Sequence, residues 1–292
     1  MKRTLSLLLL SLAMALTANA QLLWKITGNG VTKPSYLFGT HHVAPLSVLE
    51  STPGFSNALN TVDKVYGEID MQALSNPATQ LEMAQYSMAP ADSTLSKVIL
   101  ATTLARIDSL FQASGLPFTT AMLEPMKPAT VDNIVTLIFA QKVFPDFDPN
   151  SQLDLTIQKM ARDAGKQVEG LEGVDTQLKA LYGAPISEQA ESLISSLDNP
   201  VKAIEMARLM SEAYMAGDIA KLAEIIENPE NGLTPEEASR LLTDRNNAWI
   251  DILLGVIPTA SVMAVVGAGH LTGSEGLINR LREAGYTVEP VK

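Results

Sequence analysis

The chain of 292 residues contains no cysteine, so disulfide bonds are excluded and an ordinary hydrophobic core has to stabilise the fold. Its formal net charge is −11 and it has no basic stretch, which argues against nucleic acid and anionic membrane surfaces as partners. The length is that of one large domain or of two closely packed halves.

The first twenty residues have the features of a secretory signal. A basic start at Met1–Arg3 is followed by an apolar run over Leu5–Leu16 and by the small residues of Ala18–Ala20, which signal peptidase recognises. The apolar run is too short for a convincing membrane span, and no lipid-anchoring cysteine follows it. We predict a cleaved signal peptide over residues 1–20, in preference to an uncleaved signal anchor. The mature protein, residues 21–292, is expected to be periplasmic or secreted, without a membrane anchor.

The start of the mature chain predicts β-strands. Residues 22–40 indicate two short strands joined by a turn around Gly28–Gly30, and a helix is expected from there to about Asn60. The segment "KVYGEID", residues 64–70, then predicts a compact strand that ends in acidic residues.

The middle of the chain is predicted to be mainly helical. Residues 71–150 are expected to form helices separated by prolines, and a further helix runs from about Leu153 to a stop at Gly165. The segment "KQVEGLE", residues 166–172, interrupts this region as a second compact strand. Helical spacing then continues over residues 175–254.

The C-terminal end returns to strands. "SVMAVVGAGH", residues 261–270, is a near-continuous apolar run, which is typical of a buried central strand. An amphipathic helix over residues 273–285 and an edge strand over residues 286–291 follow. The sequence therefore predicts one α/β domain whose mixed central sheet is built from both chain ends, with a large helical insertion between them.

All three histidines of the chain lie in two short segments with the same spacing. "YLFGTHH", residues 36–42, and "VVGAGHL", residues 265–271, each run from an apolar strand into Gly-x-x-His. In α/β sheets ligands bind just beyond the carboxyl ends of strands, so His42 and His270 are expected to face such a crevice, with His41 packing nearby. A lone histidine is more often a satisfied polar group than a ligand, but two equivalent ones favour a function. The glycines expected to let the backbone turn there are Gly39, Gly267 and Gly269.

Carboxylates are expected at the same edge of the sheet. Glu68 ends the first compact strand, beside Asp70, and Glu172 ends the second. Taken singly, a glutamate at such a position is more often a solvated strand end or a helix cap. Together with two histidines, these residues predict a His/His/carboxylate site suited to Mn²⁺, Co²⁺, Zn²⁺ or Fe²⁺.

One arginine is expected near the core. Arg245 precedes Trp249 by four residues and so lies along the apolar face of a predicted helix, next to Asn246. A buried arginine needs a partner, for which Glu68, Glu172 or a substrate carbonyl are candidates. The alternative is an ordinary surface arginine.

These segments together resemble the TraB/GumN family over nearly the whole mature chain. "YGEID", "GKQVEGLEGVDTQL" and "RNNAWI" fall in the family's order between the two histidine segments. The resemblance implies a fold like that of erythromycin esterases and of a haem-binding lipoprotein group. Its TIKI members look like metal-dependent peptidases supported by Mn²⁺ or Co²⁺. The residues that match the family's motifs are Gly39, His42, Gly267, His270, Glu68, Glu172, Arg245 and Asn246.

The resulting hypothesis is a metal-dependent hydrolase, and most specifically a peptidase acting on a peptide or protein. His42, His270 and at least one glutamate, for which Glu68 is preferred, would hold Mn²⁺ or Co²⁺, with Zn²⁺ as a third option. The carboxylate that does not bind the ion would act as general base. The residues assigned to catalysis are Glu68, Glu172 and Arg245, the last stabilising an oxyanion, and Asn246 is assigned to substrate binding.

Two other classes of function stay open. The same crevice could bind a metal, a haem or a peptide without turnover, or the helical insertion could be a surface for a partner protein. A serine or cysteine hydrolase is not supported, because there is no cysteine and no Gly-x-Ser-x-Gly elbow. Nucleotide binding is not supported either, since the glycine spacings of such sites are missing. The metal, the substrate, the oligomeric state and the division of roles between the glutamates are left undecided.

Overall fold

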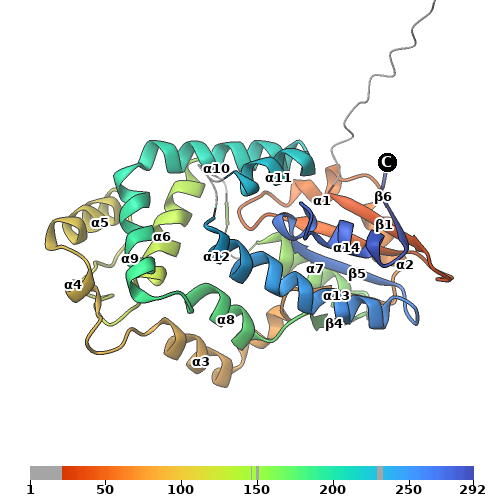
Figure 1. Cartoon of the computed structure of the whole chain (residues 1–292), viewed down its shortest axis with the longest axis horizontal. Coiled ribbons are helices and arrows are strands. Elements are labelled where there is room, and N and C mark those ends of the chain that lie inside the picture. The colour runs from red at the N-terminus through yellow and green to blue at the C-terminus, as the bar shows by residue number, and fades with distance from the viewer. Residues whose placement is uncertain (1–21, 146, 149–150, 229–232) are drawn as a thin grey trace, which may run out of the picture.

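The computed structural model describes residues 22–145, 147–148, 151–228 and 233–292. The predicted signal peptide lies outside the described residues. Within them, a sheet and its covering helices form one part of the molecule, and a group of helices extends away from it (Figure 1). No described helix is both long enough and apolar enough to pass through a bilayer.

The described strands form one mixed sheet in the order β4-β3-β5-β2-β1-β6. Strands β4, β3, β5 and β2 are parallel, whereas β1 and β6 continue the sheet in antiparallel fashion. Their bounds are β1 (Leu23–Gly28), β2 (Ser35–Thr40), β3 (Lys64–Gly67), β4 (Gln167–Gly170), β5 (Val262–Gly267) and β6 (Tyr286–Pro290). Strands from both chain ends thus make up the sheet, which confirms the predicted fold class.

The centre and the edge of the sheet lie where the sequence predicts them. Strand β5 runs between β3 and β2, and its residues from Val262 to Val266 have no exposed surface. Strand β6 lies at the edge beside β1. The turn between β1 and β2 has positive φ at Gly28, Asn29 and Gly30, which explains its Gly-Asn-Gly sequence.

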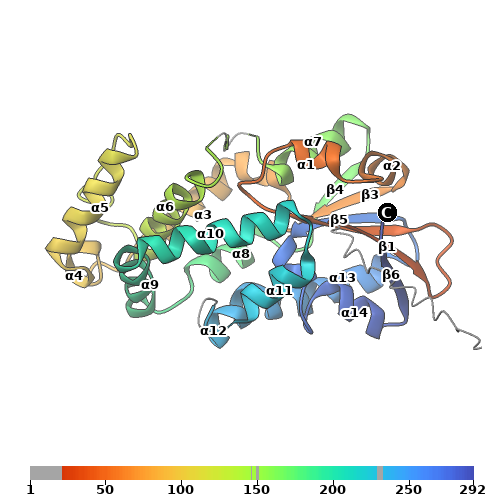
Figure 2. The ribbon, with the colours of Figure 1, turned by 90° about the horizontal axis from the view of Figure 1, so that it is seen from above.

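Helices cover both faces of the sheet (Figure 2). The alternation of side chains along β2 explains why, because Tyr36 and Phe38 belong to one core cluster and Leu37 belongs to the other. Helices α1 (Ser47–Ser51), α2 (Phe55–Thr61) and α7 (Leu153–Asp163) lie on one side, and α13 (Asp244–Val256) and α14 (Leu277–Glu283) lie on the other.

The single helix expected before about Asn60 is instead two short helices. Helix α1 ends before Pro53, and Gly54 precedes α2 with a φ of 74°, a left-handed conformation that interrupts a right-handed helix. The stop predicted at Gly165 is confirmed, because α7 ends at Asp163 and Gly165 has a φ of 73°.

The predicted helical insertion is also confirmed. Part of it has a separate core, in which Phe111, Val135 and Leu193 are fully buried. Helix α10 leads from this part back to the sheet (Figure 1). The remaining described helices of this middle region are η1 (Met71–Ser75), α3 (Pro77–Ser87), α4 (Leu95–Val98), α5 (Ala101–Ala113), α6 (Pro128–Gln141), α8 (Val174–Tyr182), α9 (Ile186–Asp198), α10 (Pro200–Met215), α11 (Ile219–Glu227), α12 (Pro235–Ala238) and the π-helix η2 (Ser239–Thr243). The 3₁₀ turn η3 (Ala268–Leu271) lies outside this region and follows β5.

The end of β3 has no room for a side chain at Gly67, and this generates a test. A Cβ atom there would lie 2.1 Å from Nε2 of Gln158 and 2.7 Å from the carbonyl oxygen of Ile69. Gln158 is buried and donates to that carbonyl, so it cannot move away without losing a hydrogen bond. We expect Gly67→Ala to lower the free energy of unfolding by about 1–3 kcal/mol, measured by urea denaturation.

Gly255 provides the matched control, because it is exposed, lies in α13 and has no atom within 4 Å of the position that a Cβ would take. Gly255→Ala is expected to raise the free energy of unfolding by about 0.5–1 kcal/mol, since alanine favours the helix. Equal effects of the two substitutions would contradict the proposed close packing at Gly67.

Candidate functional site

Four neighbouring parallel strands each lead into one of the predicted site residues. Because these strands are adjacent and parallel, their carboxyl ends meet at one edge of the sheet. The β3–β4 pairing continues beyond both strands, since the amide of Glu172 donates to the carbonyl oxygen of Glu68 at 2.9 Å. In sheet order, the residues that follow the strands are Glu172 after β4, Glu68 after β3, His270 after β5 and His42 after β2.

A cavity of about 590 Å³ opens at this edge. Its polar wall contains His42, Glu68, Arg245 and His270, so the structure brings together four of the predicted side chains around one space. Glu172 does not line the cavity, and only 4% of its side chain is exposed.

Arg245 lies at the centre of the site, with 10% of its side chain exposed. Its Nη2 donates to Glu68 at 2.7 Å and to Glu172 at 2.6 Å, so both of the carboxylate partners predicted for it are present. Its Nη1 donates to the carbonyl oxygen of Leu241 at 3.1 Å and lies 3.0 Å from Nε2 of His270. A buried guanidinium with an acceptor for each donor group is stable only if those partners keep their places.

Glu172 holds the far side of this arginine. Both of its oxygens lie 3.1 Å from Nε of Arg245, and one also accepts from the indole of Trp249 at 3.2 Å. Burial raises the pKa of Glu172, and the hydrogen bonds from Arg245 counter that effect. The carboxylate is therefore engaged with the arginine and the tryptophan on the side away from the cavity.

Glu68 faces the cavity and is held from three sides. Its Oε2 accepts from Arg245 and from Gln177 at 3.1 Å, and its Oε1 accepts from the amide of Gly267 at 2.8 Å. Burial alone would raise the pKa of Glu68, but Arg245, His42 and His270, the last in the protonated form that it takes at acidic pH, outweigh burial and lower it to about 2. Glu68 is thus an ionised carboxylate at neutral pH.

His270 is oriented by Asn246. The amide of Asn246 donates to two carbonyl oxygens, those of His270 and Glu275, so its Oδ1 accepts the proton on Nδ1 of His270 at 2.8 Å. The other ring nitrogen, Nε2, therefore carries a lone pair and lies 3.8 Å from Oε1 of Glu68. Burial lowers the pKa of His270 to about 4, which leaves the ring neutral at neutral pH.

The sequence predicts a substrate-binding role for Asn246. In the structure it is 2% exposed and does not line the cavity. Its amide is committed to His270 and Glu275, so it lies behind the histidine and orients the ring.

His42 contacts a carboxylate that the sequence analysis missed. Its Nδ1 lies 3.4 Å from Oδ2 of Asp154, a buried residue at the start of α7 whose Oδ1 accepts from Thr40 at 2.9 Å. The His42 side chain lines the cavity and is 66% exposed. The contact with Asp154 raises the pKa of His42 to about 9. Asp154 shares the apolar face of α7 with Ile157 and Ala161, and an acid on such a face was the available signal.

His41 lines the cavity next to His42 and also packs against neighbouring side chains, as the sequence predicts. Its Nε2 lies 3.3 Å from the hydroxyl of Ser211, and its ring meets the ring of Tyr214 edge-on at 5.3 Å. Burial lowers the pKa of His41 to about 4.

None of the motif glycines Gly39, Gly267 and Gly269 has a positive φ, so a left-handed backbone is not what requires glycine at these positions. They allow close approach instead. A Cβ on Gly39 would lie 3.1 Å from the Cβ of Ala268 in the second histidine segment, and one on Gly267 would lie 3.2 Å from Oε1 of Glu68. The first motif therefore packs directly against the second.

The histidines suit a divalent ion in their orientation. Nδ1 of His42 contacts Asp154 and Nδ1 of His270 contacts Asn246, which in each ring leaves Nε2 as the donor on the opposite side. Metal-binding histidines are commonly oriented in this way by an oxygen atom behind the ring. Within the described ranges, however, no group of three or more His, Asp or Glu side chains is arranged to hold a metal ion.

Arg245 occupies the side of His270 and Glu68 on which a metal ion would bind. Its guanidinium lies against Nε2 of His270 and Oε2 of Glu68, two atoms that could otherwise face an ion. Oε1 of Glu68 and Nε2 of His270 remain 3.8 Å apart. The chemistry of the donors therefore fits a divalent ion, provided that Nη1 of Arg245 moves away from His270.

Comparisons with known proteins match most of the chain. Residues 22–290 match the model of the TraB/PrgY/gumN family. The chain is 24% identical over 321 residues to a protein named Metalloprotease TIKI2 from Danio rerio, and the alignment covers 91% of this chain. The chain spans about 60% of the length of that relative. No solved structure matches the chain.

Removal of the central arginine tests how the site is held. Arg245→Met removes the cation shared by Glu68 and Glu172 and leaves two buried carboxylates close together, so we expect a loss of about 3–5 kcal/mol at pH 7, measured by urea denaturation. The low pKa of Glu68 stabilises the wild type above about pH 4.5, and this contribution disappears as the pH falls toward 2. The loss in the variant should therefore be smaller near pH 4, where the carboxylates take up protons.

Arg208 supplies the control for that experiment, because it is paired with Glu205 and Glu212 on the exposed surface of α10. Arg208→Met is expected to change the free energy of unfolding by no more than about 1 kcal/mol. A similar loss in both variants would contradict the role given to Arg245.

The three histidines should titrate in well-separated ranges in protein prepared without metal. We expect a pKa of about 9 for His42 and about 4 for His41 and His270, measured by NMR of the imidazole protons. Asp154→Asn should return the pKa of His42 toward 6.5. Since the raised pKa stabilises the fold below about 6.5 and this contribution is lost as the pH rises through 9, wild-type stability should fall in that window. A His42 pKa that the substitution leaves unchanged would rule out the contact with Asp154.

Proposed function

The chain belongs to the TraB/PrgY/gumN family, and from this membership and the geometry of its site we propose that it is a hydrolase of peptides or proteins that uses a divalent metal ion. One observation carries the proposal. Two histidines, with Nδ1 of His270 hydrogen-bonded to Asn246 and Nδ1 of His42 3.4 Å from Asp154, and an ionised glutamate converge with a buried arginine on one cavity. This combination provides donors for a cation and a positive group for a developing negative charge.

The named relative supports the choice of reaction. A protein called Metalloprotease TIKI2 is 24% identical to this chain, over 60% of its own length. At this level of identity and coverage, the peptidase activity and the use of a metal are proposals for this chain.

We assign the ion to His42, His270 and Glu68. Neutral imidazoles and a carboxylate suit Mn²⁺, Co²⁺ or Zn²⁺, with the first two preferred from the family resemblance. When bound, such an ion lowers the pKa of a coordinated water from ~15.7 to roughly 7 and so supplies a nucleophile at neutral pH. His42 has to release its proton before it can act as a ligand, and Asp154 then fixes the orientation of its ring.

The other residues have roles that their contacts suggest. Glu68 lines the cavity and Glu172 does not, so Glu68 is the glutamate assigned to the ion, and Glu172 acts through its contact with Arg245. Glu172 positions Arg245, whose Nη1 is the donor group nearest to the histidine. Moved from His270 onto a substrate carbonyl, Nη1 would stabilise the oxyanion.

A second candidate function is the binding of a peptide without turnover. The observation that favours it is the contact of 3.0 Å between Nη1 of Arg245 and Nε2 of His270, which uses the lone pair that a metal ion would need. The two functions differ in whether the protein holds a metal.

Metal analysis is the test. We propose that the chain is exported, so the protein should be purified from the periplasmic fraction without chelator. A measured mass equal to that of a chain beginning at Gln21 supports export, and the mass of the full-length chain contradicts it. We expect about one equivalent of a transition metal in the wild type and none in His42→Ala/His270→Ala, measured by elemental analysis. His41→Gln is the matched control and should keep the metal, because His41 packs against Ser211 and Tyr214.

Activity is then measured on a randomised peptide library with the metal found. Cleavage by the wild type that is lost in the double variant supports the hydrolase. No metal in either protein, even after incubation with Mn²⁺, Co²⁺ and Zn²⁺, would leave peptide binding without turnover as the better account.

A further inference from the structure

The wall of the cavity that faces the ionisable groups is aliphatic. It is formed by three helical segments from the middle of the chain, which are α10, α11 and the π-helix η2. Most of its side chains are only partly buried, so they present apolar surface to the cavity. The principal residues of this aliphatic wall are Met206, Met210, Ile225, Ile226, Leu241 and Leu242.

The aliphatic wall begins directly beside the second histidine segment. Cδ1 of Ile226 lies 3.3 Å, and Cδ2 of Leu242 lies 3.7 Å, from the position that a Cβ on Gly269 would take. Gly269 precedes His270, so its missing side chain lets the wall approach the histidine. A group bound at His270 would therefore touch apolar atoms at once.

The π-helix connects the wall to the arginine. Leu241 and Leu242 of η2 both line the cavity, and the carbonyl oxygen of Leu241 accepts from Nη1 of Arg245 at 3.1 Å. Isolated π-helical turns occur frequently at functional sites. Here Leu241 lines the cavity, and its carbonyl oxygen accepts the hydrogen bond from Arg245.

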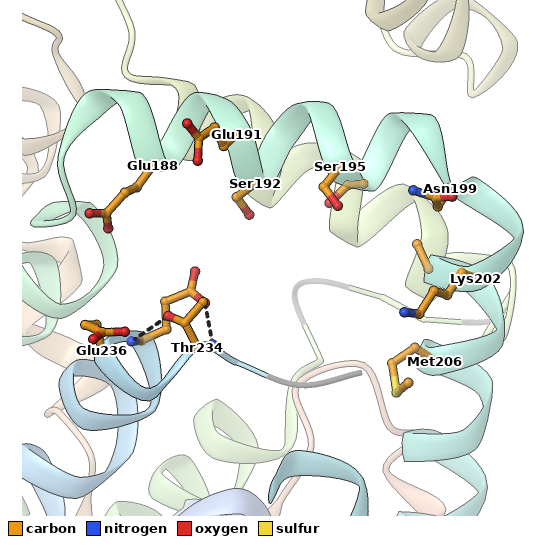
Figure 3. A pocket seen from close by; sticks show the side chains of 12 residues that line it. Glu188, Glu191, Ser192, Ser195, Asn199, Lys202, Met206, Thr234 and Glu236 are labelled. Atoms are coloured by element: carbon orange, nitrogen blue, oxygen red, sulfur yellow. Dashed lines mark hydrogen bonds between the residues drawn. The ribbon is translucent and has the colours of Figure 1, made fainter. Parts of the chain in front are cut away.

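A second cavity (Figure 3) shares part of its lining with the first. It has a volume of about 640 Å³, lies between α9, α10 and α12, and shares Ser192, Ser196 and Met206 with the inner cavity. In contrast to the aliphatic wall, the residues that line it are mostly polar or charged, and the figure shows Glu188 and Glu191 of α9 on the side opposite Glu236 of α12. Aliphatic surface is therefore concentrated in the inner cavity, next to the ionisable groups.

The two cavities fit an extended chain with one apolar side chain. The inner cavity, at about 590 Å³, has the size of an ordinary ligand site and room for one large side chain with its backbone. The polar outer cavity offers a solvated path for the residues beyond it. Methionines at Met206 and Met210 can adapt to aliphatic groups of different shapes.

We propose that the inner cavity selects peptides by a large aliphatic side chain, that of leucine, isoleucine or methionine, adjacent to the bond at the ionisable groups. The expected effect on cleavage rests on the proposed hydrolase function. The preference in peptide binding can be measured whether or not the protein cleaves peptides.

The experiment uses the full chain and a randomised peptide library in two measurements. Cleavage sites are mapped by mass spectrometry, and peptides retained by the protein are sequenced. We expect leucine, isoleucine or methionine at one position next to the cleaved bond, preferred over alanine by about tenfold or more in kcat/KM. The retained peptides should show the same enrichment.

Two variants change the wall in different ways. Met206→Gln/Met210→Gln keeps its size but makes it polar, and should lower kcat/KM for the leucine peptide about tenfold through KM, with little effect on the alanine peptide. Met210→Phe fills the cavity without adding polarity, and should shift the preference toward smaller side chains. Val201→Gln is the matched control, because Val201 is on the same helix and 80% exposed; thermal melting of each variant checks that it is folded.

The outcomes separate the selection from the hydrolase function. Cleavage without an aliphatic preference, or a preference that both wall variants leave unchanged, overturns the selection and keeps the hydrolase. Enrichment of aliphatic peptides without any cleavage keeps the selection and overturns the hydrolase. Retained peptides with no enrichment at any position overturn the selection whether or not cleavage occurs.

Discussion

The guanidinium of Arg245 is shared between two buried carboxylates, and the positions of the other site residues depend on this arrangement. A buried charge is stable only with partners in good geometry, so Glu68 and Glu172 have to stay at the ends of β3 and β4. The same guanidinium contacts Nε2 of His270 beyond β5 and the carbonyl oxygen of Leu241 in the π-helix. One side chain of α13 thereby ties three strand ends and the helical wall together.

The two Gly-x-x-His motifs are parts of one structure. Strands β2 and β5 are paired, and Gly39 of the first motif packs so closely against Ala268 of the second that a side chain at Gly39 would force its neighbours to shift. In both motifs an oxygen atom fixes the histidine from behind, that of Asp154 for His42 and that of Asn246 for His270. The repeated spacing therefore reflects close packing of two strand ends and a common way of orienting imidazoles.

The chain divides the work between its ends and its middle. The strands from the two ends lead into His42, Glu68 and His270, whereas the middle of the chain provides Glu172 after β4, Arg245 in α13, the aliphatic wall and the outer cavity. A sheet edge alone is open to water, so the ionisable groups lie in a cavity because the helices enclose them. The enclosure removes these groups from water, which lowers the pKa of His270, and it strengthens the interactions with neighbouring groups that lower the pKa of Glu68 and raise that of His42.

The sequence by itself determined the strands, the mainly helical middle and the residues at each strand end, because alternation, apolar runs and turn residues act over a few neighbours. It also indicated the burial of Arg245 from its spacing to Trp249. Only the tertiary structure decided that Asp154 contacts His42, that Glu68 and not Glu172 lines the cavity, and that the motif glycines serve close approach. Those facts depend on which side chains meet across more than a hundred residues of chain, and local periodicity carries no information about such meetings.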